Sequence, residues 1–212
     1  LVVERRTGNV KAYVGSSEYK SKERKGANNF LTAVRSPGST LKPLIYGKAL
    51  QRNLIEFNEV FNDANFYRGG YNPTNFSNTY SGKVTLKDAL LRSLNIPALI
   101  TLEKLNPRIF EAELKNLINA PVASDKEAGL SLAVGGFYLN AEQLASLYLM
   151  AIDPMMSEDI SFISSQSQKS DAKDASFLNN QAADQIVHLL IQNLPNGERV
   201  AFKTGTSFAR HD

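Results

Sequence analysis

The sequence predicts an α+β domain, in which a helical region surrounds a central helix and packs on an antiparallel sheet. Two observations support this class. Apolar residues recur at helical spacing in six stretches, namely 39–52, 85–93, 96–105, 107–117, 140–152 and 180–194. Short apolar or alternating runs bounded by turn formers occur near the two ends, at 1–15 and 199–207, and we expect both to lie in the sheet.

The first half of the chain alternates between clear and weak signals. Residues 1–15 predict two short strands around a turn at Thr7-Gly8-Asn9, and residues 16–35 predict a polar loop. The helix at 39–52 is apolar around much of its circumference, which is typical of a helix buried in the middle of a domain. Residues 53–83 place many aromatic rings between turn formers; a stacking surface is conceivable, but an irregular loop pinned by buried rings is favoured.

Capping signals mark two of the later helices. Thr85 precedes an apolar run with Asp88 three residues on, and Asn140 precedes another with Gln143 in the same relation. Residues 154–176 are rich in serine, aspartate and lysine, which predicts an exposed segment.

Composition excludes several classes of function. The chain has 212 residues, which suits one domain, and a net charge of +3, which is too small to indicate nucleic-acid binding. It contains no cysteine and two histidines far apart in sequence, so we expect no metal site and no histidine-based triad. No run of about 18 apolar residues suggests a membrane span.

The candidate chemistry begins at Ser39 and Lys42, which lie three residues apart at the start of the central helix. Residues at this spacing share a helix face, so the hydroxyl and the amine would point the same way. A serine hydroxyl becomes a good nucleophile when a base takes its proton, and a desolvated lysine can be that base. Taken alone, the pair is better explained by a helix cap and a solvated lysine, because this spacing occurs by chance in most proteins.

Two further motifs favour the chemical interpretation. Ser93-Leu94-Asn95 and Lys203-Thr204-Gly205-Thr206 follow in the order that serine β-lactamases and penicillin-binding proteins share. Each motif is weak singly, but the ordered set is a strong signal. Three accidental matches in an unrelated α+β domain are the weaker explanation.

The flanking residues resemble one family more closely. Arg35 to Pro43 (RSPGSTLKP), residues 7–15 (TGNVKAYVG) and residues 202–207 (FKTGTS) are similar to the transpeptidase domain of class A penicillin-binding proteins, and the last looks most like their 1C-type branch. The resemblance implies that residues 1–212 are one penicillin-binding transpeptidase domain. It also implies that the final strands and closing helix are absent, so we expect the domain to be incomplete at its C-terminal end.

Acyl transfer assigns hypothetical roles to the motif residues. Ser39 would attack a peptide carbonyl while Lys42, kept neutral by burial near a second ammonium, takes its proton. Ser93 would pass a proton to the leaving amine, and Asn95 would orient Lys42 and bind the substrate amide.

The last motif would hold the substrate. Lys203 would supply positive charge, and the hydroxyls of Thr204 and Thr206 would bind a carboxylate. Gly205 would leave room for the substrate backbone, and the backbone N–H groups of Ser39 and Thr206 would form the oxyanion hole.

By resemblance, the substrate is the D-Ala-D-Ala end of a peptidoglycan stem peptide. The acyl group would pass to an amine on a neighbouring stem and form a cross-link. β-Lactam antibiotics would acylate Ser39 as mimics of that substrate. No cofactor or metal is implied. The resemblance further implies a parent protein with a membrane anchor and a glycosyltransferase domain, on the periplasmic side of the bacterial inner membrane, with cell-wall assembly proteins as possible partners.

Three other functions stay open. A β-lactamase or β-lactam sensor shares the fold and motifs, but Ser93-Leu94-Asn95 and the RSPGSTLKP context favour the transpeptidase. Class A β-lactamases also carry a deacylating glutamate; Glu111 and Glu113 have the wrong spacing and are interpreted as a solvated helix face. A D,D-carboxypeptidase would use water as acceptor. A catalytically weak domain could serve as a scaffold for cell-wall assembly.

Overall fold

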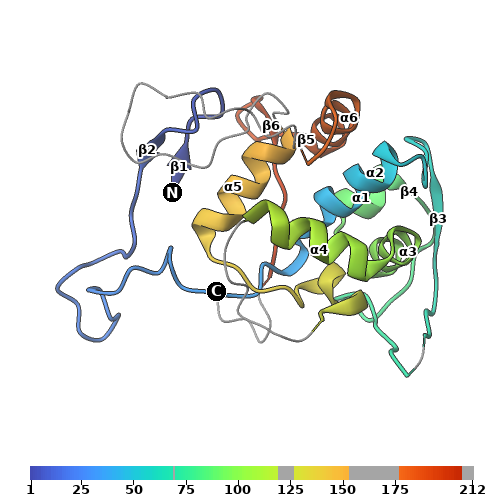
Figure 1. The fold of residues 1–212 in the computed structure, drawn as a ribbon, viewed down its shortest axis with the longest axis horizontal. Helices are drawn as coiled ribbons and strands as arrows, with labels where there is room; N and C mark the ends of the chain where they lie inside the picture. The colour runs from blue at the N-terminus through green and yellow to red at the C-terminus, as the bar shows by residue number, and fades with distance from the viewer. Residues whose placement is uncertain (69, 119–126, 153–176, 207–212) are drawn as a thin grey trace.

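Helix α1 (Lys42–Gln51) is the centre of the fold, as its apolar circumference predicts. The computed structural model describes residues 1–68, 70–118, 127–152 and 177–206 (Figure 1). Eight of the ten residues of α1 are buried, and the helix packs against α3 (Asn95–Leu105) and α6 (Asn180–Leu190). The remaining helical elements are η1 (Gly38–Leu41), α2 (Leu86–Leu91), α4 (Pro107–Ile118), η2 (Gly129–Val134) and α5 (Ala141–Ile152).

The predicted capping signals are confirmed. The Thr85 hydroxyl oxygen accepts a hydrogen bond from the Asp88 backbone N–H, which begins α2. Asn140 and Gln143 exchange hydrogen bonds between side chain and backbone, which is the reciprocal capping arrangement at the start of α5. These local bonds fix where each helix begins and therefore which face it turns toward α1.

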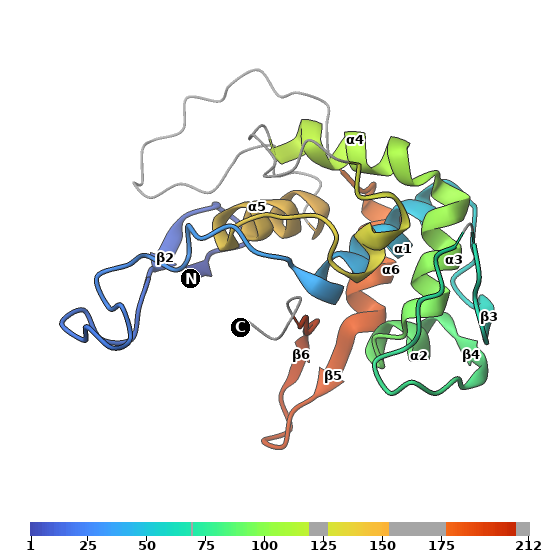
Figure 2. The ribbon, with the colours of Figure 1, turned by 90° about the horizontal axis from the view of Figure 1, so that it is seen from below.

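The strands are antiparallel, as predicted, but the described residues form three separate two-stranded sheets instead of one. The pairs are β1 (Val2–Val3) with β2 (Val10–Ala12), β3 (Val60–Asp63) with β4 (Gly82–Thr85), and β5 (Ile191–Asn193) with β6 (Arg199–Ala201). The expectation that residues 1–15 and 199–207 share a sheet is therefore wrong for this structure. The view in Figure 2 shows the β5–β6 hairpin projecting away from β1 and β2.

The end of the last helix and the segment between α1 and α2 also differ from the prediction. The last helix ends at Leu190, because Ile191 to Asn193 pair with β6 and leave the helical pattern that the apolar spacing suggested. The β3–β4 hairpin was not predicted. Within the aromatic segment only some rings are buried: Phe61 and Phe66 are, whereas Phe76 is 78% exposed. The buried rings therefore pin part of this loop, and hydrogen bonds to the Asp63 carboxylate hold it as well.

The interpretation of Glu111 and Glu113 as a solvated helix face is wrong. Glu111 is only 3% exposed and accepts a hydrogen bond from the Ala128 backbone N–H. Glu113 pairs with Arg52 at the end of α1 and with Lys48. Both carboxylates tie α4 to neighbouring segments, which gives them a structural role.

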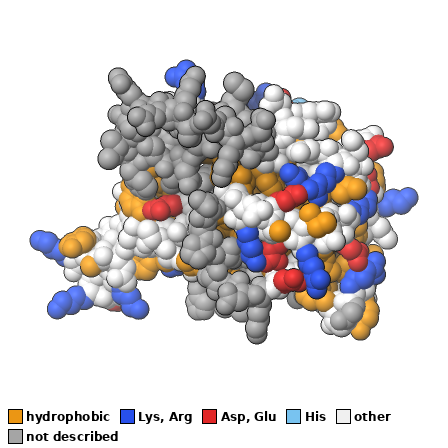
Figure 3. Space-filling model, in the orientation of Figure 1, with side chains coloured by type: hydrophobic (Ala, Val, Ile, Leu, Met, Phe, Trp, Pro, Cys, Tyr) orange, Lys and Arg blue, Asp and Glu red, His pale blue; other side chains and the backbone are white. Residues whose placement is uncertain are grey.

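The surface is mixed in character. Residues 13–35 extend as an irregular arm at the left of Figure 1, and basic and acidic side chains are interspersed on the face drawn in Figure 3. The segment expected to be exposed, 154–176, lies outside the described residues. Among the helices that the structure describes, none is long and apolar enough to cross a membrane.

Candidate active site

The three sequence motifs meet at the start of α1. The Lys42 Nζ donates hydrogen bonds to the Ser93 carbonyl oxygen and to Asn95 Oδ1, both at 2.7 Å. The Lys203 Nζ donates to Ser93 Oγ at 2.8 Å. Ser93 therefore lies between the two lysines, with its carbonyl facing one amine and its hydroxyl facing the other. The structure brings together residues that are more than 100 positions apart in sequence.

Burial sets the ionisation of Lys42. Its side chain is 0% exposed, and burial, followed by the charge of Lys203, holds the pKa of its amine well below the usual value. A neutral amine has two N–H groups and one lone pair, and within the described residues Ser93 and Asn95 accept those two hydrogens. The lone pair then remains available to take a proton.

A 3₁₀ turn carries the candidate nucleophile. Ser39 lies in η1, and the Lys42 backbone N–H donates to the Ser39 carbonyl oxygen. In this geometry residues three apart are eclipsed, so the two side chains lie on the same side of the turn. Ser39 is partly exposed, whereas Lys42 lies beneath it in the core. The Ser39–Lys42 spacing thus places a partly exposed serine one turn before a buried lysine.

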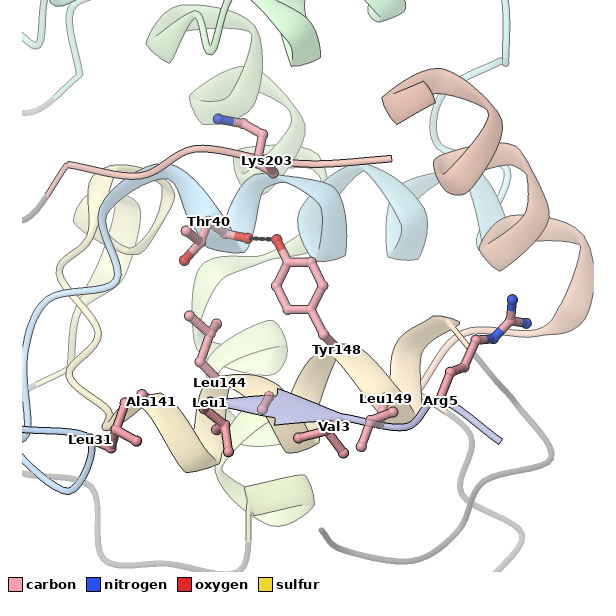
Figure 4. Close-up of a pocket in the computed structure, with 11 residues that line it drawn as sticks. Leu1, Val3, Arg5, Leu31, Thr40, Ala141, Leu144, Tyr148, Leu149 and Lys203 are labelled. Carbon is pink, nitrogen blue, oxygen red and sulfur yellow. Dashed lines mark hydrogen bonds between the residues drawn. The ribbon is translucent and has the colours of Figure 1, made fainter. Parts of the chain in front are cut away.

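The turn is braced from the second half of the chain. Ser36 Oγ donates to the Gly135 carbonyl oxygen and accepts from the Gly38 backbone N–H. Tyr148, on α5, donates its hydroxyl to the Thr40 carbonyl oxygen at 2.6 Å (Figure 4). These bonds fix the backbone on both sides of Ser39.

Ser93 owes its position to the way in which α2 ends. The Leu94 N–H bonds to the Ala89 carbonyl and the Ser93 N–H to the Leu90 carbonyl, which is the Schellman pattern of helix termination. The residue at this position takes a left-handed conformation, for which glycine is preferred, and Ser93 has φ +56°. A serine here is locally costly, so its presence indicates a role for the hydroxyl.

Lys203 is the more accessible of the two lysines. Burial lowers the pKa of its amine to about 8, so it is mostly protonated at neutral pH. Its Nζ also donates to the Thr204 carbonyl oxygen. Thr204 and Thr206 are exposed, which places two hydroxyl-bearing residues next to a positive charge. This set can bind a carboxylate.

Two glycines allow the last motif to lie directly on the nucleophile turn. A Cβ atom built on Gly205 would be 2.6 Å from both the Pro37 carbonyl oxygen and Thr40 Cγ2. A Cβ atom on Gly38, which has φ +55°, would be 2.2 Å from the Thr206 carbonyl oxygen. Gly205 is thus needed for packing against the turn, which is a different reason from the substrate approach expected from the sequence.

An apolar cavity of about 560 Å³ lies beside this assembly. It is bordered by β1, α5 and the turn, and Figure 4 shows Tyr148 pointing through it toward Thr40 while the Lys203 amine points away. Ser39, Lys42 and Ser93 do not line it. In the described part of the chain, no cluster of histidine, aspartate and glutamate could hold a metal ion.

The residues that support Asn95 were not predicted from the sequence. Its side-chain N–H donates to the Thr74 carbonyl, and its backbone N–H donates to Asn75 Oδ1. Asn75 in turn binds the buried carboxylate of Asp63. Asp63 and Asn75 both lie in the segment interpreted as an irregular loop, and nothing in its sequence pairs one with the other.

The helical region, the paired antiparallel strands and the three converging motifs define a domain of the serine β-lactamase and penicillin-binding class of folds. The chain belongs to the penicillin-binding protein transpeptidase domain family, whose family model matches residues 1–211. The resemblance inferred from RSPGSTLKP and the two other motifs is thereby confirmed.

Curated relatives agree with this assignment. The chain is 32% identical over 227 residues to penicillin-binding protein 1C of Escherichia coli (strain K12), covering 100% of this chain and 28% of that protein. It is 38% identical over 138 residues to penicillin-binding protein 1F of Bacillus subtilis (strain 168), covering 64% of this chain and 18% of that protein. The chain thus spans less than a third of the length of either relative.

Solved structures share the fold. A peptidoglycan glycosyltransferase from Burkholderia ambifaria superposes with a TM-score of 0.74 at 20% identity, covering 98% of this chain and 72% of the other. The penicillin-binding protein PonA1 from Mycobacterium tuberculosis gives a TM-score of 0.71 at 19% identity, covering 96% and 60%.

Proposed function

We propose that this domain is a serine D,D-transpeptidase that cross-links peptidoglycan stem peptides and is covalently inhibited by β-lactams. The observation that carries the proposal is the buried Lys42 amine, which donates to Ser93 and Asn95 and follows Ser39 by one 3₁₀ turn. The family match and the names of the relatives support the same function.

The proposed reaction has two acyl transfers. Ser39 Oγ attacks the carbonyl carbon of the penultimate D-Ala and gives its proton to Lys42. The C–N bond then breaks, and the terminal D-Ala leaves as an amine after receiving a proton through Ser93. An amine from a neighbouring stem attacks the resulting ester, so that an amide forms and the Ser39 hydroxyl is regenerated. No cofactor or metal enters these steps.

Charge and hydrogen bonds account for the substrate. The free C-terminal carboxylate of a D-Ala-D-Ala peptide matches Lys203 with Thr204 and Thr206. The Thr206 backbone packs against Gly38, so its N–H and that of Ser39 belong to adjoining segments and are the proposed oxyanion donors. Asn95, with Lys42 on its oxygen, would also contact the substrate amide.

The cellular setting follows from the relatives. We infer that the domain acts within a longer class A penicillin-binding protein that carries a membrane anchor and a glycosyltransferase domain. It would work on the periplasmic side of the bacterial inner membrane, with cell-wall assembly proteins as neighbours. β-Lactam antibiotics would be its small-molecule inhibitors.

Intact-mass spectrometry after incubation with benzylpenicillin tests the proposal. We expect one lasting adduct on the 212-residue chain and none on Ser39→Ala. Rapid hydrolysis of the drug without an adduct would indicate a β-lactamase, and a folded wild type that never reacts would indicate a scaffold. Release of D-Ala from a stem peptide is then measured with and without an acceptor amine. Release that requires the amine indicates a transpeptidase, and equal release in water alone indicates a carboxypeptidase.

Ser93 offers a test in which stability and activity separate. Ser93→Ala and Ser93→Gly both remove the hydroxyl, so we expect both to slow acylation by about 10²-fold or more, the range for a lost proton-transfer group. Only glycine relieves the positive φ of 56°. Ser93→Gly should therefore be more stable than Ser93→Ala by about 1 kcal/mol in urea unfolding. Equal stability of the two variants would contradict the strain argument.

A further inference from the structure

A chain of hydrogen bonds leads from a buried carboxylate on β3 to the candidate general base. Asp63 is 0% exposed, and its two oxygens accept from Asn75 Nδ2 at 2.8 and 2.9 Å. Asn75 Oδ1 accepts from the Asn95 backbone N–H at 2.8 Å. The Asn95 side chain completes the chain by accepting from Lys42.

The polarity of this chain is fixed at its far end. A carboxylate only accepts hydrogen bonds, so the amide group of Asn75 must turn its NH₂ toward Asp63. The same NH₂ donates to the Thr79 carbonyl oxygen at 3.0 Å, which also only accepts. The Asn75 oxygen is left to face the Asn95 backbone N–H. If the Asn75 amide were rotated, its oxygen would face the oxygens of Asp63 and Thr79, and its NH₂ would face the Asn95 backbone N–H.

The orientation of Asn95 follows from its neighbours in the same way. Its backbone N–H, at the first residue of α3, is held by Asn75. Its side-chain NH₂ donates at 2.7 Å to the carbonyl oxygen of Thr74, the residue that precedes Asn75. The Asn95 oxygen is therefore the atom turned toward Lys42. A reversed amide would present N–H groups to the Lys42 lone pair and compete for it.

We propose that Asp63 and Asn75 are positioning residues of the active site. They hold the backbone at the start of α3 so that the side-chain oxygen of Asn95 faces Lys42. The inference rests on the proposed function, because it explains how the general base keeps its lone pair available. Neither residue touches the substrate in this scheme. Asp63 acts through Asn75, and Asn75 acts through the start of α3 and the adjacent Thr74 carbonyl.

Asp63→Asn is the sharpest test because it preserves size and removes only the acceptor-only character. The Ser81 backbone N–H donates to Asp63 Oδ2 at 2.8 Å, so an amide at position 63 would keep its oxygen there and turn its NH₂ toward Asn75. Asn75 then loses one acceptor, and it holds the start of α3, and with it the Asn95 oxygen, less firmly. We expect the acylation rate at saturating fluorescent penicillin to fall at least tenfold, as for other groups that orient a reactive residue through a hydrogen bond. Asn75→Ala should have a similar effect.

A second readout does not depend on catalysis. The ¹³Cε signal of Lys42 in lysine-labelled protein, assigned with Lys42→Arg, reports the titration of its amine, whose charged neighbour is Lys203. We expect the pKa of Lys42 to fall further in Asp63→Asn, because an Asn95 side-chain oxygen that is held less firmly against Lys42 stabilises its ammonium form less. Asn179→Ala is the matched control: it removes the N-cap of α6, which typically costs about 1 kcal/mol, far from the site.

The outcomes separate the two proposals. Slower acylation and a shifted Lys42 titration in Asp63→Asn, with Asn179→Ala unchanged in both, would support the positioning role. A folded Asp63→Asn that matches the wild type in both readouts would overturn it. If the wild type itself fails to acylate, the proposed function falls, and the Lys42 titration alone decides whether Asp63 and Asn75 control this amine.

Discussion

Lys42→Met is expected to slow the acylation of Ser39 by penicillin by about 10²- to 10⁴-fold, the usual contribution of a general base. Methionine matches the length of the lysine stem and suits a side chain that is 0% exposed. The variant should fold, because burying a thioether avoids the desolvation of an amine. The acylation rate is measured by stopped-flow mixing with fluorescent penicillin. Lys48→Met, on the same helix, serves as the control variant.

The pH dependence of stability provides an independent check on Lys42. In the folded protein the pKa of Lys42 lies well below 10.5, its ordinary value. Between the folded pKa and 10.5, the unfolded chain therefore carries a proton on Lys42 that the folded chain has lost. Wild-type stability should therefore rise with pH across this window relative to Lys42→Met, by linkage. Parallel stability curves for the two proteins would show that Lys42 is not held neutral. A wild-type acylation rate equal to that of Lys42→Met would show that Lys42 is not the general base.

Gly38→Ala is the second change with a large expected effect. The new methyl group would meet the Thr206 carbonyl oxygen at 2.2 Å and would also hold a non-glycine residue at φ +55°. We expect the Lys203–Thr206 segment to move off the nucleophile turn, and a displacement of about 1 Å can cost 10²-fold in rate. Acylation kinetics and urea unfolding measure the two consequences.

Gly129→Ala separates strain from contact in this experiment. Gly129 has φ +56°, and no atom lies within 4 Å of a Cβ built there. Both alanine variants should lose about 1–2 kcal/mol from the left-handed conformation, but only Gly38→Ala should lose acylation. Equal acylation in the two variants would mean that the contact between Gly38 and Thr206 does not align the site.

The helices and the identity of the motifs were predictable because their signals are local. Apolar spacing located α1 to α6, and capping residues such as Thr85 and Asn140 marked helix starts within a residue. The ordered motifs identified Ser39, Lys42, Ser93 and Lys203 as residues that should meet. Their meeting required no knowledge of the path of the chain between them.

The remaining features depend on partners that are distant in sequence. Ile191 continues a helical pattern, yet pairing with Ala201 makes it a strand. Glu111 looks solvated until the Ala128 N–H is placed against it. Asp63 occupies a buried position of β3, and its burial makes sense only with the Asn75 amide in position. In each case tertiary contacts override the local pattern.

The contact of Gly38 with Thr206 has a consequence for the order in which the chain matures. It joins the beginning of the central helix to a segment near the other end of the described chain, and such distant contacts form slowly because a long loop must close first. During synthesis the helical core can assemble before the segment Lys203–Thr206 has left the ribosome. If the domain is acylated by penicillin as proposed, that reactivity should appear late and all at once in pulse-labelled translation, only in chains that extend past Thr206.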